Sequence, residues 1–528
     1  MMMESAPLTN GILKARESTL LSHAVHLHAR YRGTFPAISD STTGLNYVEL
    51  DAACDRLAKS LRFAARPGDR VAIAMESSVC YIVAVIAGLR SGLIVCPLNT
   101  KLAAPEVSAY AATIEPRLVL ADSVNADAAA STGCPVVVIS NVHTDLEFGS
   151  AAEGVQVSRE PEVSLDAPAM LFGTGGTTGV PKAAIYTHRS IWAAIASYSI
   201  DGKRSPSTNE LTYSPFFHIA LMAPLSTLYM GGQLEVVPTV DPAAVLDGLN
   251  RGINVIGGTA PTTWVKLRAH QDFEKTDRRS LRSIFLGSAA VAPSLVETLL
   301  VDFPDTAIYS GFGSTEHGTV SYATREQLEE GHITGVGRPL PGVQVRVVDS
   351  LGHDVSVGEP GELAVTTPWQ AVGYWNRPAE TVATWTDVGI RIGDVGTVSE
   401  DGWITIVGRT KDMIITGGEN VFPSEVEPVL LRHSDIAEAA VYGVADDYWG
   451  ERIEAAIVLR PGTDIDLEQV RDWCRQDIAG YKLPRSLRKV VKLPTTGAHK
   501  VDHRRLRQMA EEDPAPKRTD KIGSEVAP

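Results

Sequence analysis

A loop rich in glycine and threonine, residues 171–182, is the first stretch whose residue types could do chemistry: it reads Leu-Phe-Gly-Thr-Gly-Gly-Thr-Thr-Gly-Val-Pro-Lys. Glycine lets backbone approach a bulky anion closely and adopt positive φ, and successive amide N–H groups in such a loop can form an anion-binding concavity. Threonine hydroxyls add donors, and the terminal lysine adds a positive charge. The loop predicts a polyphosphate site made by Thr174, Gly175, Gly176, Thr177, Thr178 and Lys182.

This loop is not one of the common nucleotide motifs. A Walker A loop needs Gly-Lys-Ser/Thr in series, which is absent here, and the last glycine of G-x-G-x-x-G falls on Thr178. A surface turn that binds nothing is the alternative interpretation, although long glycine-rich loops in compact domains are usually functional or disordered.

Five later segments also carry residues suited to chemistry, and each has a plain structural alternative. Taken one at a time, the segments have ordinary explanations: a packed turn with one histidine at 213–219 and a glycine-rich turn beside one glutamate at 309–316. Surface turn residues would explain 391–412, and a solvated lysine would explain 494–500. The segments are 213–219 (Tyr-Ser-Pro-Phe-Phe-His-Ile), 287–293 (Gly-Ser-Ala-Ala-Val-Ala-Pro), 309–316 (Tyr-Ser-Gly-Phe-Gly-Ser-Thr-Glu), 391–412 and 494–500 (Pro-Thr-Thr-Gly-Ala-His-Lys).

Taken together and in this order, the segments resemble the motifs of the adenylate-forming enzymes, which comprise acyl-CoA synthetases, luciferases and peptide-synthetase adenylation domains. The resemblance covers about residues 20–505 and is closest to the acyl-CoA synthetases. Three positions depart from the family pattern. Ala183 replaces a glycine after the loop, Phe312 stands where the family motif Tyr-Gly-x-Thr-Glu has tyrosine, and His499 replaces a glycine before Lys500. The last change stiffens the loop around that lysine.

The resemblance implies a role for each motif around ATP, Mg²⁺ and coenzyme A. Beyond the phosphate loop, the nucleotide would contact Ser288, Ala289, Ala290, Phe312, Gly313, Asp394 and Arg409. Thr315 would bind the α-phosphate, Glu316 would be a Mg²⁺ ligand, and Lys500 would bridge the carboxylate and the α-phosphate. The acid would lie near His218, Gly287 and Gly311, the hinge between domains would be Lys411, and the loop for the thioester step would contain Gly417 and Gly418.

These roles imply an ATP-dependent carboxylic acid–CoA ligase, an acid–thiol ligase. It would form an acyl-adenylate with release of pyrophosphate, then an acyl-CoA thioester with release of AMP. One alternative is an enzyme that hands its adenylate to a carrier protein or separate partner, and another is a nucleotide-binding protein without catalysis. No acidic residue stands in 213–219 to pair with an α-ammonium group, which favours a small carboxylic acid without an α-amine. The small residues at 288–290 and 311 hint at room for a bulky acyl group.

Composition limits the partners. The chain has 528 residues and a net charge of −15, which argues against nucleic acid or anionic membrane as the main partner. Five cysteines without a C-x-x-C motif suit reduced thiols in a cytoplasmic protein. The longest apolar run, 79–89, is far shorter than the roughly 20 residues of a membrane span. The N-terminus lacks a signal-peptide pattern, and a homodimer stays open.

The elements that must position these residues alternate between helix and strand. Helices are expected at 52–63, 79–89 and 105–113, with strands at 70–75, 93–97, 118–121 and 136–139. This alternation predicts an α/β fold with parallel sheets. Histidines 23, 26 and 28 lack a complete ligand set, so a solvated helix face is preferred to a metal site.

We expect a large N-terminal domain, residues 1–410, built from two sheet-and-helix subdomains and a small β-barrel-like unit at about 335–410. A small mobile α/β C-terminal domain would follow at 411–510, and a disordered tail at 511–528. The expected secondary structure changes near residue 335, where short strands and turns begin. It changes again after the expected hinge, where a small α/β pattern follows.

Overall fold

The computed structural model describes residues 20–142, 161, 163–174, 181–257, 260–287, 289, 291–333, 335–446, 448–495 and 501–514. The chain divides into two compact units: unit 1 is Met1–Gln344 with Val365–Ile390, and unit 2 is Val345–Ala364 with Arg391–Pro528. Each unit is described by itself. The predicted boundary at residues 410 and 411 stays a prediction.

The first sheet of unit 1 has six strands in the order β6-β5-β3-β4-β7-β8. Its neighbours pair in parallel except β7 and β8, which form an antiparallel pair. The strands are β3 (Arg70–Ala74), β4 (Ile94–Pro97), β5 (Leu118–Ala121), β6 (Val136–Val138), β7 (Pro168–Gly173) and β8 (Ala183–Thr187). The glycine- and threonine-rich loop therefore connects the antiparallel pair.

The second sheet of unit 1 has nine strands in the order β15-β14-β13-β12-β11-β9-β10-β1-β2. Neighbouring strands in the run β13-β12-β11-β9-β10-β1 pair in parallel. Strands β2, β14 and β15 pair antiparallel with their neighbours at the two ends of this run. Their bounds are β1 (Pro36–Ser39), β2 (Gly44–Asn46), β9 (Asn209–Thr212), β10 (Gln233–Val236), β11 (Val255–Gly257), β12 (Ser283–Leu286), β13 (Ala307–Ser314), β14 (Gly318–Ala323) and β15 (Arg338–Pro339).

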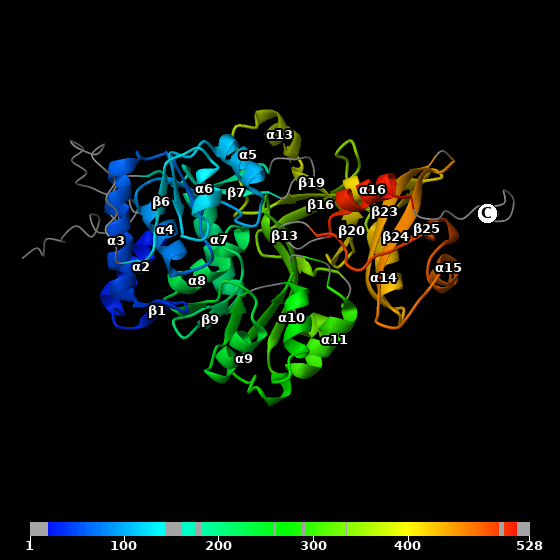
Figure 1. The fold of residues 1–528 in the computed structure, drawn as a ribbon, viewed down its shortest axis with the longest axis horizontal. Helices are drawn as coiled ribbons and strands as arrows, with labels where there is room; N and C mark the ends of the chain where they lie inside the picture. Colours follow the sequence, from blue (N-terminus) through cyan, green and yellow to red (C-terminus); the bar gives the residue numbers. More distant parts are fainter. Residues whose placement is uncertain are drawn as a thin grey trace, which may run out of the picture. The chain divides into compact units, whose positions relative to one another are not determined.

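Helices connect these strands, and Figure 1 shows α9, α10 and α11 in green beside the nine-stranded sheet. The helices of unit 1 are α2 (Leu20–Tyr31), α3 (Tyr47–Ala64), α4 (Val79–Arg90), α5 (Ala104–Ile114), α6 (Ala126–Ala130), α7 (His188–Asp201), α8 (Met222–Tyr229), α9 (Pro242–Asn250), α10 (Pro261–Arg268), α11 (Pro293–Asp302), α12 (Arg325–Glu329) and α13 (Pro378–Thr384). The helices and strands predicted in the first 140 residues are confirmed, with bounds that differ by a few residues.

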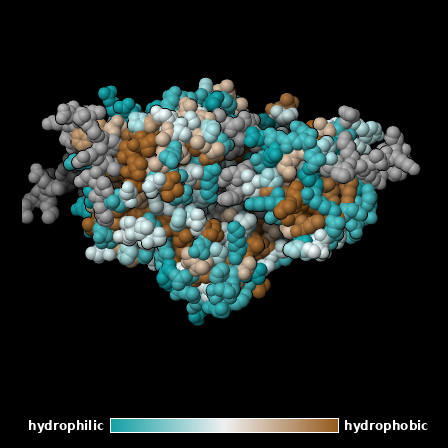
Figure 2. All heavy atoms as spheres, in the orientation of Figure 1, coloured by the Kyte–Doolittle hydropathy of each residue, from teal (hydrophilic) through white to brown (hydrophobic). Residues whose placement is uncertain are grey.

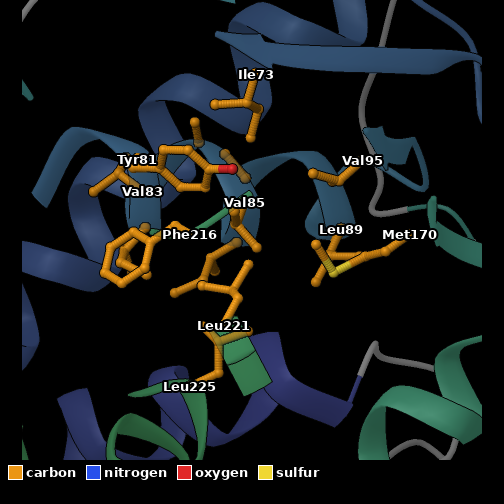
Figure 3. Packing of buried hydrophobic residues seen from close by; sticks show 14 of the residues in the cluster. Ile73, Tyr81, Val83, Val85, Leu89, Val95, Met170, Phe216, Leu221 and Leu225 are labelled. Carbon is orange, nitrogen blue, oxygen red and sulfur yellow. The ribbon is translucent and has the colours of Figure 1, made fainter. Parts of the chain in front are cut away.

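One core cluster of unit 1 includes most of α4, whose apolar side chains are buried nearly all round the helix. The helix begins where the Ser78 side chain accepts a hydrogen bond from the Tyr81 N–H. Figure 3 shows Leu89 beside Val95 and Met170 from the six-stranded sheet, and Tyr81 beside Phe216, whose rings are 5.3 Å apart. This core anchors 213–219, one of the predicted site segments.

Two further sheets complete the described chain. One has the order β16-β17-β19-β18 with β20 paired to β19: β16 (Gln344–Val348), β17 (Gly361–Thr366), β18 (Trp385–Thr386), β19 (Gly389–Val398) and β20 (Ile404–Arg409). The other has the order β22-β21-β24-β23 with β25 paired to β24: β21 (Ile414–Thr416), β22 (Glu419–Val421), β23 (Ile436–Asp446), β24 (Gly450–Leu459) and β25 (Ser486–Lys489). It is accompanied by α14 (Pro423–Leu431), α15 (Leu467–Cys474) and α16 (His503–Glu512). The predicted mixed α/β class, with several sheets, is confirmed.

Helix α16 corrects the predicted start of the tail. Residues 511 and 512, expected to be disordered, form the end of this helix. Leu506 and Ala510 are buried in a cluster with Tyr442 of β23, and this packing holds the helix in place. The sequence after residue 514 lies outside the described residues.

The three N-terminal histidines lie on α2, and two of them contact protein atoms. The His26 Nδ1 atom is 2.9 Å from an Asp51 carboxylate oxygen, and His28 bonds to the Tyr229 carbonyl at 2.8 Å. Across the described residues, no group of three histidine, cysteine or acidic side chains could hold a metal ion.

Hydrophilic residues cover much of the face drawn in Figure 2, with hydrophobic residues scattered among them. Isolated exposed apolar side chains such as Val124, Ile200 and Val301 are ordinary at a protein surface. None of the helices that the structure describes has the length and apolar character needed to cross a bilayer.

Candidate active site

The ends of the glycine- and threonine-rich loop are fixed by the β7–β8 hairpin. The Thr174 N–H donates to the Lys182 carbonyl at 2.8 Å, and Thr174 is buried. The loop therefore begins and ends at the same edge of the six-stranded sheet. Gly175, Gly176, Thr177 and Thr178 lie outside the described residues, so the predicted phosphate cradle itself stays a prediction.

Thr315 and Glu316 lie in the turn between β13 and β14. The Ser314 hydroxyl oxygen accepts hydrogen bonds from the Glu316 and His317 N–H groups, both at 3.1 Å, which closes the turn. The Tyr186 hydroxyl on β8 donates to the Thr315 carbonyl at 2.9 Å. This bond links the strand that follows the glycine- and threonine-rich loop to the turn that carries Glu316.

Tyr374 joins the two predicted charged groups of this site. Its hydroxyl donates to Oε1 of Glu316 at 2.7 Å, and the Lys182 Nζ atom is 4.6 Å from the centre of its ring. No sequence signal marked Tyr374, because its partners are 58 and 192 residues away and the contacts form only in the folded chain.

Burial sets the protonation of this tyrosine. Removal from water, and then the negative charge of Glu316 and its hydrogen bond, raise the pKa of Tyr374 well above its ordinary value. The hydroxyl therefore stays protonated and remains a donor to the carboxylate through the neutral pH range.

The donor set around Glu316 fits a magnesium ion that is shared with a nucleotide. Glu316 is 8% exposed, and its Oε1 atom accepts the hydrogen bond from the Tyr374 hydroxyl. Mg²⁺ usually takes one or two protein carboxylates, substrate phosphates and several waters, so a single carboxylate near a phosphate loop is sufficient. When bound, the ion would neutralise charge on the phosphates.

Strand β13 places the predicted adenine and acid residues close together. Phe312 is half-buried, and Gly313 is exposed with its α-carbon against β14, where an added Cβ would lie 2.4 Å from the Gly318 carbonyl oxygen. An added Cβ on Gly311 would lie 2.5 Å from the Tyr322 ring. The small residue at 311 therefore accommodates the Tyr322 ring. The expectation that Gly311 leaves room for an acyl group stays a prediction.

The remaining predicted acid and adenine residues of unit 1 follow β12 and precede α8. Gly287 is buried directly after β12, and Ala289 is exposed, whereas Ser288 and Ala290 lie outside the described residues. His218 is half-buried, and its ring centre is 4.4 Å from that of Phe217. Whether an acid lies between these residues stays a prediction.

Unit 2 holds the other predicted residues. Arg409 Nε is 2.7 Å from Oδ1 of the buried Asp394. Lys411 lies in the short helix η4 (Thr410–Asp412), and Gly417 and Gly418 form the turn between β21 and β22 with φ of 61° and 90°. Lys500 lies outside the described residues, but Thr495 and Val501, which flank its segment, pair as an antiparallel bridge.

Comparison with known proteins decides the family. The model of the AMP-binding enzyme family matches residues 25–375, and that of the AMP-binding enzyme C-terminal domain matches residues 425–500. The chain belongs to the AMP-binding enzyme family. The resemblance to adenylate-forming enzymes is thereby confirmed.

Several relatives of this AMP-binding enzyme are acyl-CoA ligases. It is 33% identical to a feruloyl-CoA synthase of Amycolatopsis over 88% of this chain and 94% of the relative, and 30% identical to an indoleacetate–CoA ligase of Aromatoleum aromaticum over 93% and 98%. Among solved structures, the o-succinylbenzoate CoA synthetase of Bacillus subtilis in complex with its acyl-adenylate intermediate aligns with a TM-score of 0.81 at 25% identity, over 94% of this chain and 98% of that one. The predicted reaction type, acid adenylation followed by thioester formation with ATP and coenzyme A, is confirmed as that of the family.

Proposed function

We propose that this chain is an acid–thiol ligase that joins a carboxylic acid without an α-amino group to coenzyme A. The observation that carries the proposal is the cluster of Lys182, Tyr374 and Glu316 at the end of the phosphate loop. In this proposal the loop and Lys182 bind the β- and γ-phosphates, and Thr315 and Lys500 bind at the α-phosphate where the carboxylate attacks. Such a displacement depends on positioning and charge neutralisation more than on proton transfer.

The substrate class is inferred from 213–219. The described side chains there include the buried Phe216 and Phe217 and the half-buried His218, and the segment has no carboxylate. An α-ammonium group would lose its hydration there without gaining a partner. Aryl, indolyl and aliphatic acids fit this apolar segment better than amino acids, and ferulate, indoleacetate and fatty acids are the substrates in the names of its relatives.

The test is a pyrophosphate-release screen over aryl, indolyl, fatty and amino acids, with Mg·ATP and with or without coenzyme A. We expect release with at least one acid that lacks an α-amine and formation of its acyl-CoA. Release with amino acids alone would contradict the substrate class. Release with no acid in the panel would contradict the proposal.

Two comparisons support an acceptor of the acyl group other than coenzyme A. The chain is 29% identical to a fatty acid–[acyl-carrier-protein] ligase of Streptomyces coeruleorubidus over 92% of its length, and it aligns with an amide bond synthetase of Marinactinospora thermotolerans with a TM-score of 0.83. If pyrophosphate is released but no acyl-CoA forms, transfer to a carrier protein or an amine becomes the preferred function.

A further inference from the structure

The backbone around Tyr374 is held on two sides. Val372 and Trp375 donate N–H hydrogen bonds to Ile185 and Ala183 of β8 at 2.9 and 2.8 Å, and the Ile185 N–H donates to Gly373. On the other side, the Ala371 N–H donates to the Glu316 carbonyl at 3.0 Å. The segment 371–375 therefore lies beside both the strand that follows Lys182 and the turn that carries Glu316.

Side-chain contacts fix Tyr374 itself within this segment. Its N–H donates to the Thr381 hydroxyl at 2.9 Å, and its ring lies edge-on to Trp385 at 4.9 Å. Trp385 in turn donates from Nε1 to the Ala371 carbonyl at 2.8 Å. Gly373 has a φ of 153°, and a Cβ there would lie 2.9 Å from Thr381, so this close approach requires glycine. The tyrosine has little freedom to leave its position.

Two opposite charges are arranged around this one ring. The hydroxyl donates to the buried Glu316 carboxylate, and the face attracts the Lys182 ammonium group, which is within the distance of a cation–π contact. A hydrogen bond to a charged acceptor is stronger than one between neutral groups and fixes which oxygen is engaged. Tyr374 therefore engages Oε1 and limits the rotation of the Glu316 carboxylate.

We propose that Tyr374 is a positioning residue, which orients Glu316 toward the metal and Lys182 toward the phosphates of the bound nucleotide. This inference rests on the proposed function, because it assigns the ligands of both side chains. In this role Tyr374 would act through Glu316 and Lys182.

The first test compares Tyr374→Phe with the wild type in the full-length chain. The substitution keeps the aromatic ring beside Lys182 and removes the hydroxyl group that donates to Glu316. We expect the Mg²⁺ concentration for half-maximal pyrophosphate release to rise on the order of tenfold, the effect of one hydrogen bond to a charged group. Calorimetric titration should show weaker binding of Mg·ATP and unchanged binding of ATP in EDTA. An unchanged Mg²⁺ dependence in both measurements would overturn the inference.

Matched variants separate positioning from a loss of stability. Tyr442→Phe removes the same kind of bond, from a buried tyrosine hydroxyl to Oε1 of Glu454 at 2.7 Å, and should leave the Mg²⁺ dependence unchanged. Thr381→Val keeps the hydroxyl of Tyr374 but removes the acceptor of its N–H, and should shift the Mg²⁺ dependence in the same direction by less. This variant still tests the inference if Tyr374→Phe does not fold.

A double-mutant cycle with Glu316→Gln tests whether Tyr374 acts through Glu316. If Tyr374 acts through Glu316, Tyr374→Phe should add no further change in Mg²⁺ dependence to Glu316→Gln. Additive effects would overturn the inference. If the wild type releases no pyrophosphate with any acid, the proposed function fails, and the Mg·ATP titration still decides whether Tyr374 and Glu316 act together.

Discussion

Arg409 Nε lies 2.7 Å from Oδ1 of Asp394, and the two residues are directly opposite each other in the antiparallel pair β19–β20. The carboxylate is almost fully buried and the guanidinium is 39% exposed, so the pair presents its positive end to solvent. Two residues that the motifs assigned to the nucleotide thus form one ion pair. Its geometry is set by strand register.

We expect Asp394→Asn to raise the KM for ATP on the order of tenfold with a smaller change in kcat, because it removes a charged acceptor while keeping the shape of the side chain. Steady-state kinetics with ATP varied would measure this. Glu362→Gln is the matched control, since Glu362 bonds to Arg391 in the same sheet at 2.8 Å. An ATP KM that responds equally to both substitutions would point to a general effect on the sheet.

Lys500→Ala should lower adenylation on the order of 10²-fold or more, since it removes a charge contact to the transition state. Conversion of supplied acyl-adenylate to acyl-CoA should change much less. Pyrophosphate release and thioester formation, assayed as separate half-reactions, would show the difference. Lys492→Ala, at an exposed lysine, is the control. Equal loss in both half-reactions would refute a role restricted to adenylation.

Glu427 on α14 predicts a pH dependence of stability. Burial, and to a lesser extent the charge of Asp412, raise its pKa from 4.5 to about 7, although its Oε1 accepts the Val441 N–H at 2.9 Å. Between these values the folded state holds a proton that the unfolded state has lost. The stability from this carboxyl is therefore fully present below about pH 4.5, falls as pH rises, and is lost above about pH 7, by roughly 3 kcal/mol at most.

Glu427→Gln should make the urea midpoint of unfolding less dependent on pH between about 4.5 and about 7, because the amide keeps an acceptor for Val441 and does not titrate. Glu425→Gln on the same helix is the control, since it removes the ion pair with Lys482 and leaves the buried carboxyl in place. A Glu427→Gln protein with the same pH dependence as the wild type would contradict the prediction.

Gly311→Ala should destabilise the protein by about 1–3 kcal/mol, because the new methyl group would overlap the Tyr322 ring. Thermal unfolding would measure the loss. Adding Tyr322→Leu to Gly311→Ala should recover part of it, since the smaller side chain leaves space for the methyl group. If Tyr322→Leu lowers the midpoint equally in both backgrounds, the two positions do not interact.

Local sequence was sufficient to predict many of the helices and strands. Residues 118–121 form a short apolar run, and 79–89 an apolar segment that begins at a capping serine, so burial and hydrogen bonding of the backbone leave few alternatives to a strand and a helix. The small size of Gly311 did not define its role, because a glycine can equally leave space for a ligand or for a neighbouring ring. Tyr322 lies on the adjacent strand, and only the pairing of β13 with β14 brings it there.

The sequence by itself determined the alternating helices and strands, the adenylate-forming motifs and their order, and through them the reaction type. These follow from periodicity, from turn residues and from functional groups that lie within a few residues of one another. The tertiary structure decided that Tyr374 joins Lys182 to Glu316 and that Arg409 faces Asp394. Such contacts depend on strand pairing between distant segments, because an atom's neighbours in space are set by register and packing that no short stretch of sequence contains.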